Sequence, residues 1–413
     1  MPKTQTQVGI IGGGIIGVCT ALYLQRIGYD VSIIDAKGIA KECSQGNAGH
    51  FATEQIFPLA DKALLANLPK MLLDPLGPFR IKPSYFLKAL PWFLRFVWQM
   101  RKRPFTHSKL KLKELNKHAL CAFEELLAPF ELDNLITLQG SILTFESTPD
   151  EQIETLLNKY LDEGVDVSWL SKEQILAIEP NLSENVTSAF LFNLGGHTAD
   201  PEQLCVSLAE QFLAGGGQII IDQIEDINTQ DAVLLTGEMH SYHFDKIVVA
   251  TGAWSKKLAH QLGYFVPLDT ERGYHLMVEQ ADMITRPIAS AERKFIMTPM
   301  SNGLRLAGTV EFAGLDAPLN NQRADILLPH AKSTLRSLPD AKISEPWMGF
   351  RPSLPDSLPV IGQAPRHSSV FFAFGHHHLG LTHGAITGKL IAEQMSGQRT
   401  TIDLAPFCIS RFN

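Results

Sequence analysis

The chain has 413 residues with 36 basic and 43 acidic side chains, and its formal net charge is −7. Hydrophobic residues make up 45% of the chain and charged residues 19%, which excludes disordered, collagen-like and coiled-coil proteins. The length corresponds to two or three domains of about 150 residues each. The mild negative charge argues against a nucleic-acid-binding protein, although a whole-chain sum can conceal a local basic patch.

The cysteines and the N-terminus indicate a cytoplasmic protein. Five widely spaced cysteines without a CxxC pair exclude a disulfide framework and a zinc site. Residues 1–7 are polar and lack the basic and apolar regions of a signal peptide. No run of about 18 apolar residues occurs, so we expect no membrane-spanning helix.

The first 35 residues contain a strand, a glycine-rich turn, a helix and a second strand. An apolar run, 8–11, leads into the GxGxxG sequence 12–17, and a helical pattern follows as far as Gly28. A second apolar run, 31–34, closes with Asp35. This order and spacing predict a site for an adenine dinucleotide, either NAD or FAD.

Each part of this motif has a physical role. Gly12 permits the tight turn, Gly14 lets a pyrophosphate approach the backbone, and Gly17 lets the helix pack closely on the strand. The phosphates would lie at the helix N-terminus, where free N–H groups and the helix dipole favour anions. Asp35 would accept hydrogen bonds from a ribose. The predicted cofactor contacts of this motif are Gly12, Gly14, Ile15, Ile16, Gly17, Asp35 and Ala36.

Three later segments place small residues and an arginine at the ends of strands. Ala250, Thr251 and Gly252 follow the apolar run 246–249, which allows a second close backbone approach to a dinucleotide. Gly349-Phe350-Arg351-Pro352 comes about 100 residues later. The segment 371–390 is typical of a strand, a glycine turn and a helix.

Together with Ser44-x-x-Asn47-Ala48-Gly49 and Gly375-His376-x-x-x-Gly380, these motifs make the chain resemble the D-amino-acid oxidase/dehydrogenase family of FAD flavoproteins. The resemblance covers essentially the whole chain and is greatest to bacterial D-amino-acid dehydrogenases, including D-hydroxyproline dehydrogenases. It implies an α/β fold with a discontinuous Rossmann-like FAD-binding domain over 1–58, 198–263 and 345–413. It also implies an α+β substrate-binding domain with a large mixed sheet over 59–197 and 264–344.

The resemblance assigns further contacts to FAD. The 44–50 stretch would run along the ribityl chain, the backbone of Ile224 would meet adenine, and the 375–380 loop would cover the flavin. The helix after that loop would aim its positive end at the pyrimidine edge of the flavin. The contacts implied in this way are Ser44, Asn47, Ala48, Gly49, Ile224, Ala250, Thr251, Gly252, Gly375, His376, His377, Leu379, Gly380, Leu381 and Thr382.

The resemblance also assigns a substrate site. Arg351 would hold the substrate carboxylate with its planar, permanently charged guanidinium. Tyr274 would either contact substrate or pack within a sheet, and His50 and His378 would approach the flavin or line the cavity. Hydride would pass from the substrate Cα to the flavin, and the resulting imine would hydrolyse to a 2-oxo acid. Because adjacent residues point in different directions, we expect no metal site at the three histidines 376–378.

The segment 79–117 carries eleven basic residues and one acidic residue, Glu114, a local net charge of +10. Aromatic and aliphatic residues alternate with them, and Pro91 is expected to divide the run into two short helices. Such a segment is typical of a helix in an anionic membrane interface, from which a reduced flavin could pass electrons to a quinone. The alternative is a helix that packs its aromatic residues inward and leaves Lys and Arg in water.

The sequence leaves one expected function and two alternatives. The expected enzyme is an FAD-dependent D-amino-acid or imino-acid dehydrogenase in the cytoplasm or at the inner face of the cell membrane. A flavin-dependent 2-hydroxy-acid dehydrogenase and a non-catalytic FAD-bound subunit of an imino-acid dehydrogenase complex are the alternatives. The expected partners are an amino or imino acid, a quinone or other electron acceptor, and no nucleic acid.

Overall fold

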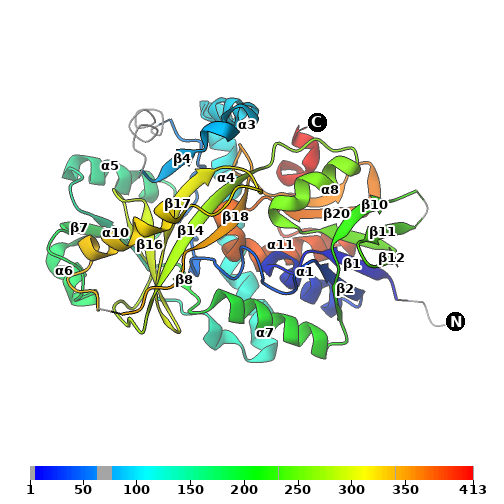
Figure 1. Cartoon of the computed structure of the whole chain (residues 1–413), viewed down its shortest axis with the longest axis horizontal. Coiled ribbons are helices and arrows are strands. Elements are labelled where there is room, and N and C mark those ends of the chain that lie inside the picture. Colours follow the sequence, from blue (N-terminus) through cyan, green and yellow to red (C-terminus); the bar gives the residue numbers. More distant parts are fainter. Residues whose placement is uncertain (1–4, 63–76, 231, 340, 413) are drawn as a thin grey trace.

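The computed structural model describes residues 5–62, 77–230, 232–339 and 341–412. Two large sheets lie toward opposite ends of the long axis of the molecule (Figure 1). Both sheets are built from segments that are far apart in the chain, so each sheet forms only when distant parts of the sequence come together.

The first sheet has six strands in the order β19-β20-β13-β1-β2-β9. All of its pairings are parallel except the β19–β20 hairpin. Its strands are nearly continuous apolar runs because both faces are covered. Their bounds are β1 (Gln7–Ile11), β2 (Asp30–Asp35), β9 (Gln218–Ile221), β13 (Lys246–Val249), β19 (Val360–Ala364) and β20 (His367–Phe374).

Helices cover one face of this sheet and a small sheet with one helix covers the other. The first face packs against α1 (Ile15–Arg26), α4 (Lys102–Leu127), α7 (Pro201–Ala214) and α11 (Gly380–Met395). The second packs against β10 (Ile224–Asn228), β11 (Val233–Gly237), β12 (Ser241–Phe244) and α8 (Ser255–Gln261). The predicted strand–helix–strand unit at the N-terminus is therefore confirmed.

The second sheet has nine strands and is mixed, as expected. Its order is β18-β14-β17-β16-β15-β5-β7-β6, and β4 adds to β17. The bounds are β4 (Phe79–Ile81), β5 (Ser141–Phe145), β6 (Val167–Ser171), β7 (Ser188–Phe192), β14 (Asp269–Glu279), β15 (Ile288–Ser290), β16 (Phe295–Met300), β17 (Gly303–Phe312) and β18 (Trp347–Ser353). Strand β18 pairs with β14, so this sheet extends into the last segment that we assigned to the FAD-binding domain.

The remaining elements frame the second sheet. Helices α9 (Asn321–Asp325) and α10 (Leu327–Thr334) pack on its central strands, and α5 (Asp150–Leu161) and α6 (Lys172–Ile178) pack near β6 and β7. Strands β3 (His50–Phe51) and β8 (Gly196–His197) pair with each other.

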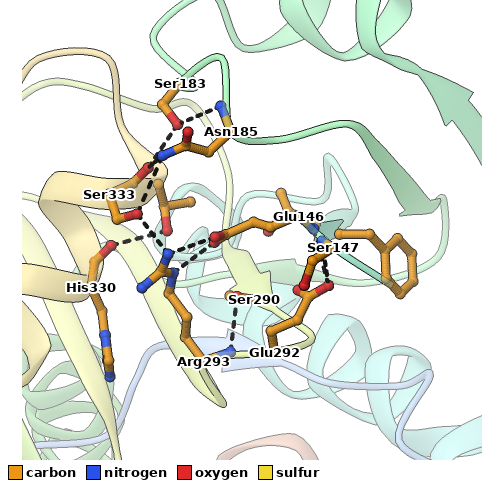
Figure 2. Close-up of polar contacts among 12 residues, drawn as sticks. Glu146, Ser147, Ser183, Asn185, Ser290, Glu292, Arg293, His330 and Ser333 are labelled. Carbon is orange, nitrogen blue, oxygen red and sulfur yellow. Dashed lines mark hydrogen bonds and ion pairs between the residues drawn. The ribbon is translucent and has the colours of Figure 1, made fainter. Parts of the chain in front are cut away.

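A polar cluster ties the turn after β5 to the β15–β16 loop and to α10. Arg293 donates to both carboxylate oxygens of Glu146 at 2.7 and 2.6 Å and to the hydroxyl of Ser333 at 2.6 Å (Figure 2). The neighbouring Glu292 accepts the backbone N–H groups of residues 146–148. Because a bidentate arginine–carboxylate pair fixes orientation as well as distance, this cluster holds three separate segments in one arrangement.

The basic segment contains α3 (Phe86–Gln99), which connects to α4 through Met100 and Arg101. The expectation that Pro91 divides this segment is wrong, because α3 continues through Pro91 and ends at Gln99. Proline removes one backbone hydrogen bond, the one to the carbonyl of Leu87 four positions earlier, and Leu87 is 79% exposed. Packing of Trp92 and Phe96 holds the helix together across the proline. Of the helices described, none has the length and apolarity needed to cross a bilayer.

Candidate functional site

A cavity of about 1950 Å³ lies between the two large sheets and reaches the carboxyl ends of the parallel strands. This is where ligands bind in open α/β sheets. The predicted cofactor residues on its wall are Gly12, Gly14, Ile15, Ile16, Asp35, Ala36, Ser44, Asn47, Ala48, Ile224, Ala250, Thr251, Gly252, Gly375, His376, His377, Gly380 and Leu381. The structure thus brings together residues that are up to 369 positions apart in the chain.

The wall beside α1 is formed mainly by backbone. Gly12 has φ +117°, and a Cβ atom on it would lie 2.4 Å from the carbonyl oxygen of Ala250. The N-cap residue Gly14 offers no side chain, and no acidic residue lies in the first turn of α1. Ser44 Oγ accepts the N–H of Ile15 at 3.0 Å, while Asp35 accepts the N–H of Gly13 at 2.7 Å. A glycine-lined helix N-terminus with a carboxylate at the next strand end fits the pyrophosphate and ribose of a dinucleotide.

Four of the predicted cofactor residues do not lie on the cavity wall: Gly17, Gly49, Leu379 and Thr382. Gly17 lies inside α1 against the Gly12 carbonyl, and Gly49 has φ +73° beside the Thr198 carbonyl. Leu379 belongs to the core beneath the first sheet. The Thr382 hydroxyl accepts the N–H of Ala52 at 3.0 Å. These four residues contact the segments that form the wall and do not line the cavity themselves.

The three consecutive histidines have three different surroundings. His376 Nε2 lies 3.0 Å from the Thr387 hydroxyl, and His377 accepts the N–H of Leu354 at Nε2 and bonds Ser353 Oγ through Nδ1 at 2.8 Å. His378 lines the cavity. Among the residues that the structure describes, no three His, Cys, Asp or Glu side chains are arranged to hold a metal ion.

Arg351 lies on β18 and lines the cavity from the second sheet. Its guanidinium extends over Gly273, where a Cβ atom would be only 2.3 Å from Nη2. Burial lowers the pKa of Arg351, while Glu271 and Cys43 act in the opposite direction, and the group stays cationic. No hydrogen bond or ion pair joins the guanidinium to any described residue. The guanidinium is therefore available to a ligand in the cavity.

A hydrogen-bonded chain lies behind Arg351. His377 accepts at Nε2, so its proton is on Nδ1 and is donated to Ser353, whose hydroxyl donates to Glu271. Glu271 lies opposite Arg351 in the backbone register of the β14–β18 ladder. The buried Glu271 carboxyl, to which the Ser353 hydroxyl donates, raises the pKa of Arg351 and so favours its cationic form.

Tyr274 occupies the packing position that we considered as the alternative to a substrate contact. It is 1% exposed, although it borders the cavity, and it belongs to the core under α10. Its hydroxyl donates to Glu311 at 2.6 Å. Opposite residues of a strand pair share a face, and Arg351 lies opposite Glu271, so Tyr274, three residues further, points to the other face.

His50 and His378 both line the cavity. Burial lowers the pKa of each imidazole to about 3, with smaller contributions from His197 at His50 and from Arg351 at His378. Both rings are therefore neutral near pH 7. His50, His378 and Arg351 all line this cavity.

The sequence did not point to Glu54, which also lines the cavity and is 4% exposed. Its Oε1 lies 3.7 Å from Nε2 of His50. The only signal in the sequence was the spacing of four residues between His50 and Glu54. This spacing does not predict a contact between the two side chains unless the local fold is known.

Helix α3 forms the apolar end of the cavity. Phe86, Leu90, Phe93 and Val97 line the cavity, while Leu87, Leu94 and Trp98 on the next stripe of the helix are 79%, 65% and 56% exposed. Trp92 and Phe96 pack inward against Phe312. The helix therefore combines a packed face with an exposed apolar face.

Comparison with known proteins agrees with this geometry. The profile described as FAD dependent oxidoreductase (DAO) matches residues 7–394. The chain belongs to this family of FAD-dependent oxidoreductases. FAD is accordingly the cofactor that the glycine-lined wall accommodates.

Individual relatives align over the full length. The chain is 35% identical to a D-amino-acid oxidase of Bradyrhizobium diazoefficiens, covering 100% of both chains. It is 25% identical to a D-amino acid dehydrogenase of Vibrio atlanticus, covering 98% and 100%. The fold is similar to glycine oxidase from Geobacillus kaustophilus, with a TM-score of 0.76, 21% identity and coverage of 98% and 99%.

Proposed function

We propose that the protein oxidises the C–N bond of a D-amino acid or of a cyclic D-imino acid such as D-proline or D-hydroxyproline. The product is an imine that hydrolyses to a 2-oxo acid. The observation that carries this proposal is the Arg351 guanidinium, which lines the cavity without a partner among the described residues. The names of the full-length relatives, D-amino-acid oxidase and D-amino acid dehydrogenase, support the substrate class.

Arg351 holds the substrate carboxylate with two parallel N–H···O bonds, which fix the orientation of Cα. The neutral rings of His50 and His378 line the same wall and add no competing cation near the substrate. When bound, FAD accepts a hydride from Cα and passes the two electrons to an acceptor, for which we propose a quinone.

Replacement of Arg351 tests this proposal. A charged hydrogen bond contributes about 1.5–3 kcal/mol, so loss of a bidentate contact in Arg351→Leu should lower kcat/KM for the best amino acid by about 100-fold or more. Arg351→Lys should recover part of it. Arg399→Leu, a change at an exposed arginine outside the cavity lining, is the matched control. Retention of FAD is checked by its absorbance, and an unchanged kcat/KM in Arg351→Leu would remove this residue from the site.

A substrate panel identifies the reaction. D- and L-amino acids, N-methyl amino acids, cyclic imino acids and 2-hydroxy acids are each tested with a dye acceptor, with and without oxygen. We expect turnover of D-amino or D-imino acids by the isolated chain. Oxidation of 2-hydroxy acids alone would overturn the proposed reaction, and an inactive flavoprotein would indicate a non-catalytic subunit.

We also propose that α3 contacts an anionic membrane surface, from which the quinone reaches the cavity. Contiguous exposed apolar residues are unusual on a monomeric protein. Leu87, Leu94 and Trp98 form such a stripe, and Lys88 and Arg95 flank it, which complements a negatively charged interface.

Vesicle binding tests the membrane contact. Vesicles that contain anionic lipid should retain the protein at low salt and release it at high salt. Leu94→Glu should abolish retention, whereas Leu194→Glu, at an equally exposed leucine away from α3, should not. Absence of retention on any vesicle composition would refute the contact.

A further inference from the structure

Glu54 and His50 leave polar atoms without partners at the cavity wall. Glu54 Oε2 and His50 Nε2 are buried, and neither has a hydrogen-bond partner among the described residues. The Glu54 side chain is 4% exposed and borders the cavity. Buried polar atoms are hydrogen-bonded in the great majority of cases, so these two adjacent atoms on the cavity wall are available to a ligand.

The charges on this wall match the two ends of an amino acid. Arg351 offers a cation, and His378, His50 and Glu54 line the same cavity, with Glu54 Oε1 3.7 Å from Nε2 of His50. An amino acid bound in this cavity would find a cation for its carboxylate in Arg351 and an acceptor for its ammonium group in Glu54. A carboxylate is the acceptor that an ammonium group requires in a buried site.

We propose that Glu54 is the residue that binds the substrate ammonium group and takes its proton. This inference rests on the proposed amino-acid oxidation. One N–H bond of the ammonium breaks, an O–H bond forms on Glu54, and the electron pair stays on nitrogen. That lone pair then forms the C=N bond as the hydride leaves Cα for the flavin. An ammonium group has no lone pair and cannot assist in this way.

The titration of the neighbouring groups leaves Glu54 as the proton-binding group in the neutral range. Burial raises the pKa of the Glu54 carboxyl to about 7. Burial lowers the pKa of His50 and His378 to about 3 and that of His197 to about 4. Burial, and to a lesser extent the charge of Glu54, raises the pKa of Tyr160 in α5, and Arg351 stays cationic. The proton-accepting carboxylate therefore forms as the pH rises through about 7.

Glu54→Gln tests the inference, because the amide preserves shape and cannot take the proton. We expect kcat/KM to fall 10²- to 10³-fold and the loss of activity below pH 7 to disappear from its pH profile. Glu54→Asp should restore part of the rate, together with the loss of activity below pH 7. Binding of a 2-oxo acid, which has no ammonium group, should be unchanged in Glu54→Gln.

A second measurement follows the proton directly. Calorimetry of amino-acid binding in buffers of different ionisation enthalpy gives the number of protons exchanged, and this number should become independent of pH near 7 in Glu54→Gln. Glu292→Gln is the matched control, because Glu292 also borders the cavity and also has an unpartnered Oε2. A Glu54→Gln enzyme with the native pH profile would refute the role of Glu54 and leave the amino-acid reaction intact. Failure of every amino acid to react with the native enzyme would refute the proposed function itself.

Discussion

Replacement of Gly17 in α1 by alanine has two opposing effects, a gain in helix propensity and a clash with the Gly12 carbonyl. It therefore tests whether the glycine-lined wall binds FAD. In a helix interior, glycine to alanine stabilises by about 1 kcal/mol through helix propensity alone. A Cβ atom on Gly17 would, however, lie 1.9 Å from the carbonyl oxygen of Gly12. Contacts shorter than 3.0 Å are essentially never observed for a real Cβ, so the helix N-terminus or the loop must move by at least about 1.1 Å.

A shift of this size displaces the N–H groups that would hold the pyrophosphate of FAD. Loss of one or two charge-assisted hydrogen bonds, each worth about 1.5–3 kcal/mol, predicts a Kd for FAD that rises by about 10²-fold or more in Gly17→Ala. The assay is fluorescence titration of the apoprotein with FAD, together with urea unfolding of both forms. Gly384→Ala in α11 is the control, because its added Cβ would approach only side-chain atoms, the nearest at 3.1 Å. A Gly17→Ala protein that binds FAD normally and unfolds at higher urea concentration would refute the reasoning.

Three further predictions concern the packing and protonation of the core. Tyr274→Phe removes the hydroxyl group that donates to the buried Glu311 carboxylate. We expect the free energy of unfolding to fall by about 1–3 kcal/mol while KM stays nearly unchanged. A tenfold rise in KM would show instead that Tyr274 contacts the substrate. Thr382→Val removes the acceptor of the Ala52 N–H and should destabilise by a similar amount in urea, which unaltered unfolding would contradict. Buried histidines with a lowered pKa bind protons only when the protein unfolds. The melting temperature should therefore be highest above about pH 6.5 and fall steadily from pH 6.5 to 5. A melting temperature that stays constant over this range would contradict the burial of these histidines. The histidines whose pKa falls to about 3 are His50, His275, His377, His378 and His383.

The parts of the site that the sequence predicted are local or depend on a distinctive short motif. The turn from Gly12 to Gly17 and the acid at Asp35 lie within one strand–helix–strand unit, so neighbouring residues alone specify them. Arg351 was found through the Gly-x-Arg-Pro motif, and the structure places it on the cavity wall.

Features that depend on distant packing could not be predicted. The face to which Tyr274 points depends on the register of β14 against β18, where Arg351 lies opposite Glu271. The burial of Glu54 on the cavity wall depends on parts of the chain that are remote in sequence, such as Tyr160. The helix around Pro91 continues because the second sheet supports Trp92, which no local signal reveals.

The strand order of the six-stranded sheet has a consequence for how the protein is made. Its central strand β13 is flanked by β1, from the beginning of the chain, and by β20, which ends at Phe374. Until β20 has been synthesised, one edge of β13 has no partner in this sheet, and an open strand edge is a template for pairing with another chain. The helix α11, which covers the same sheet, comes later still. The nascent chain therefore has neither a complete FAD-binding cavity nor a protected sheet edge. We expect FAD to bind after translation is complete, and chaperones to bind the exposed edge of β13 until then.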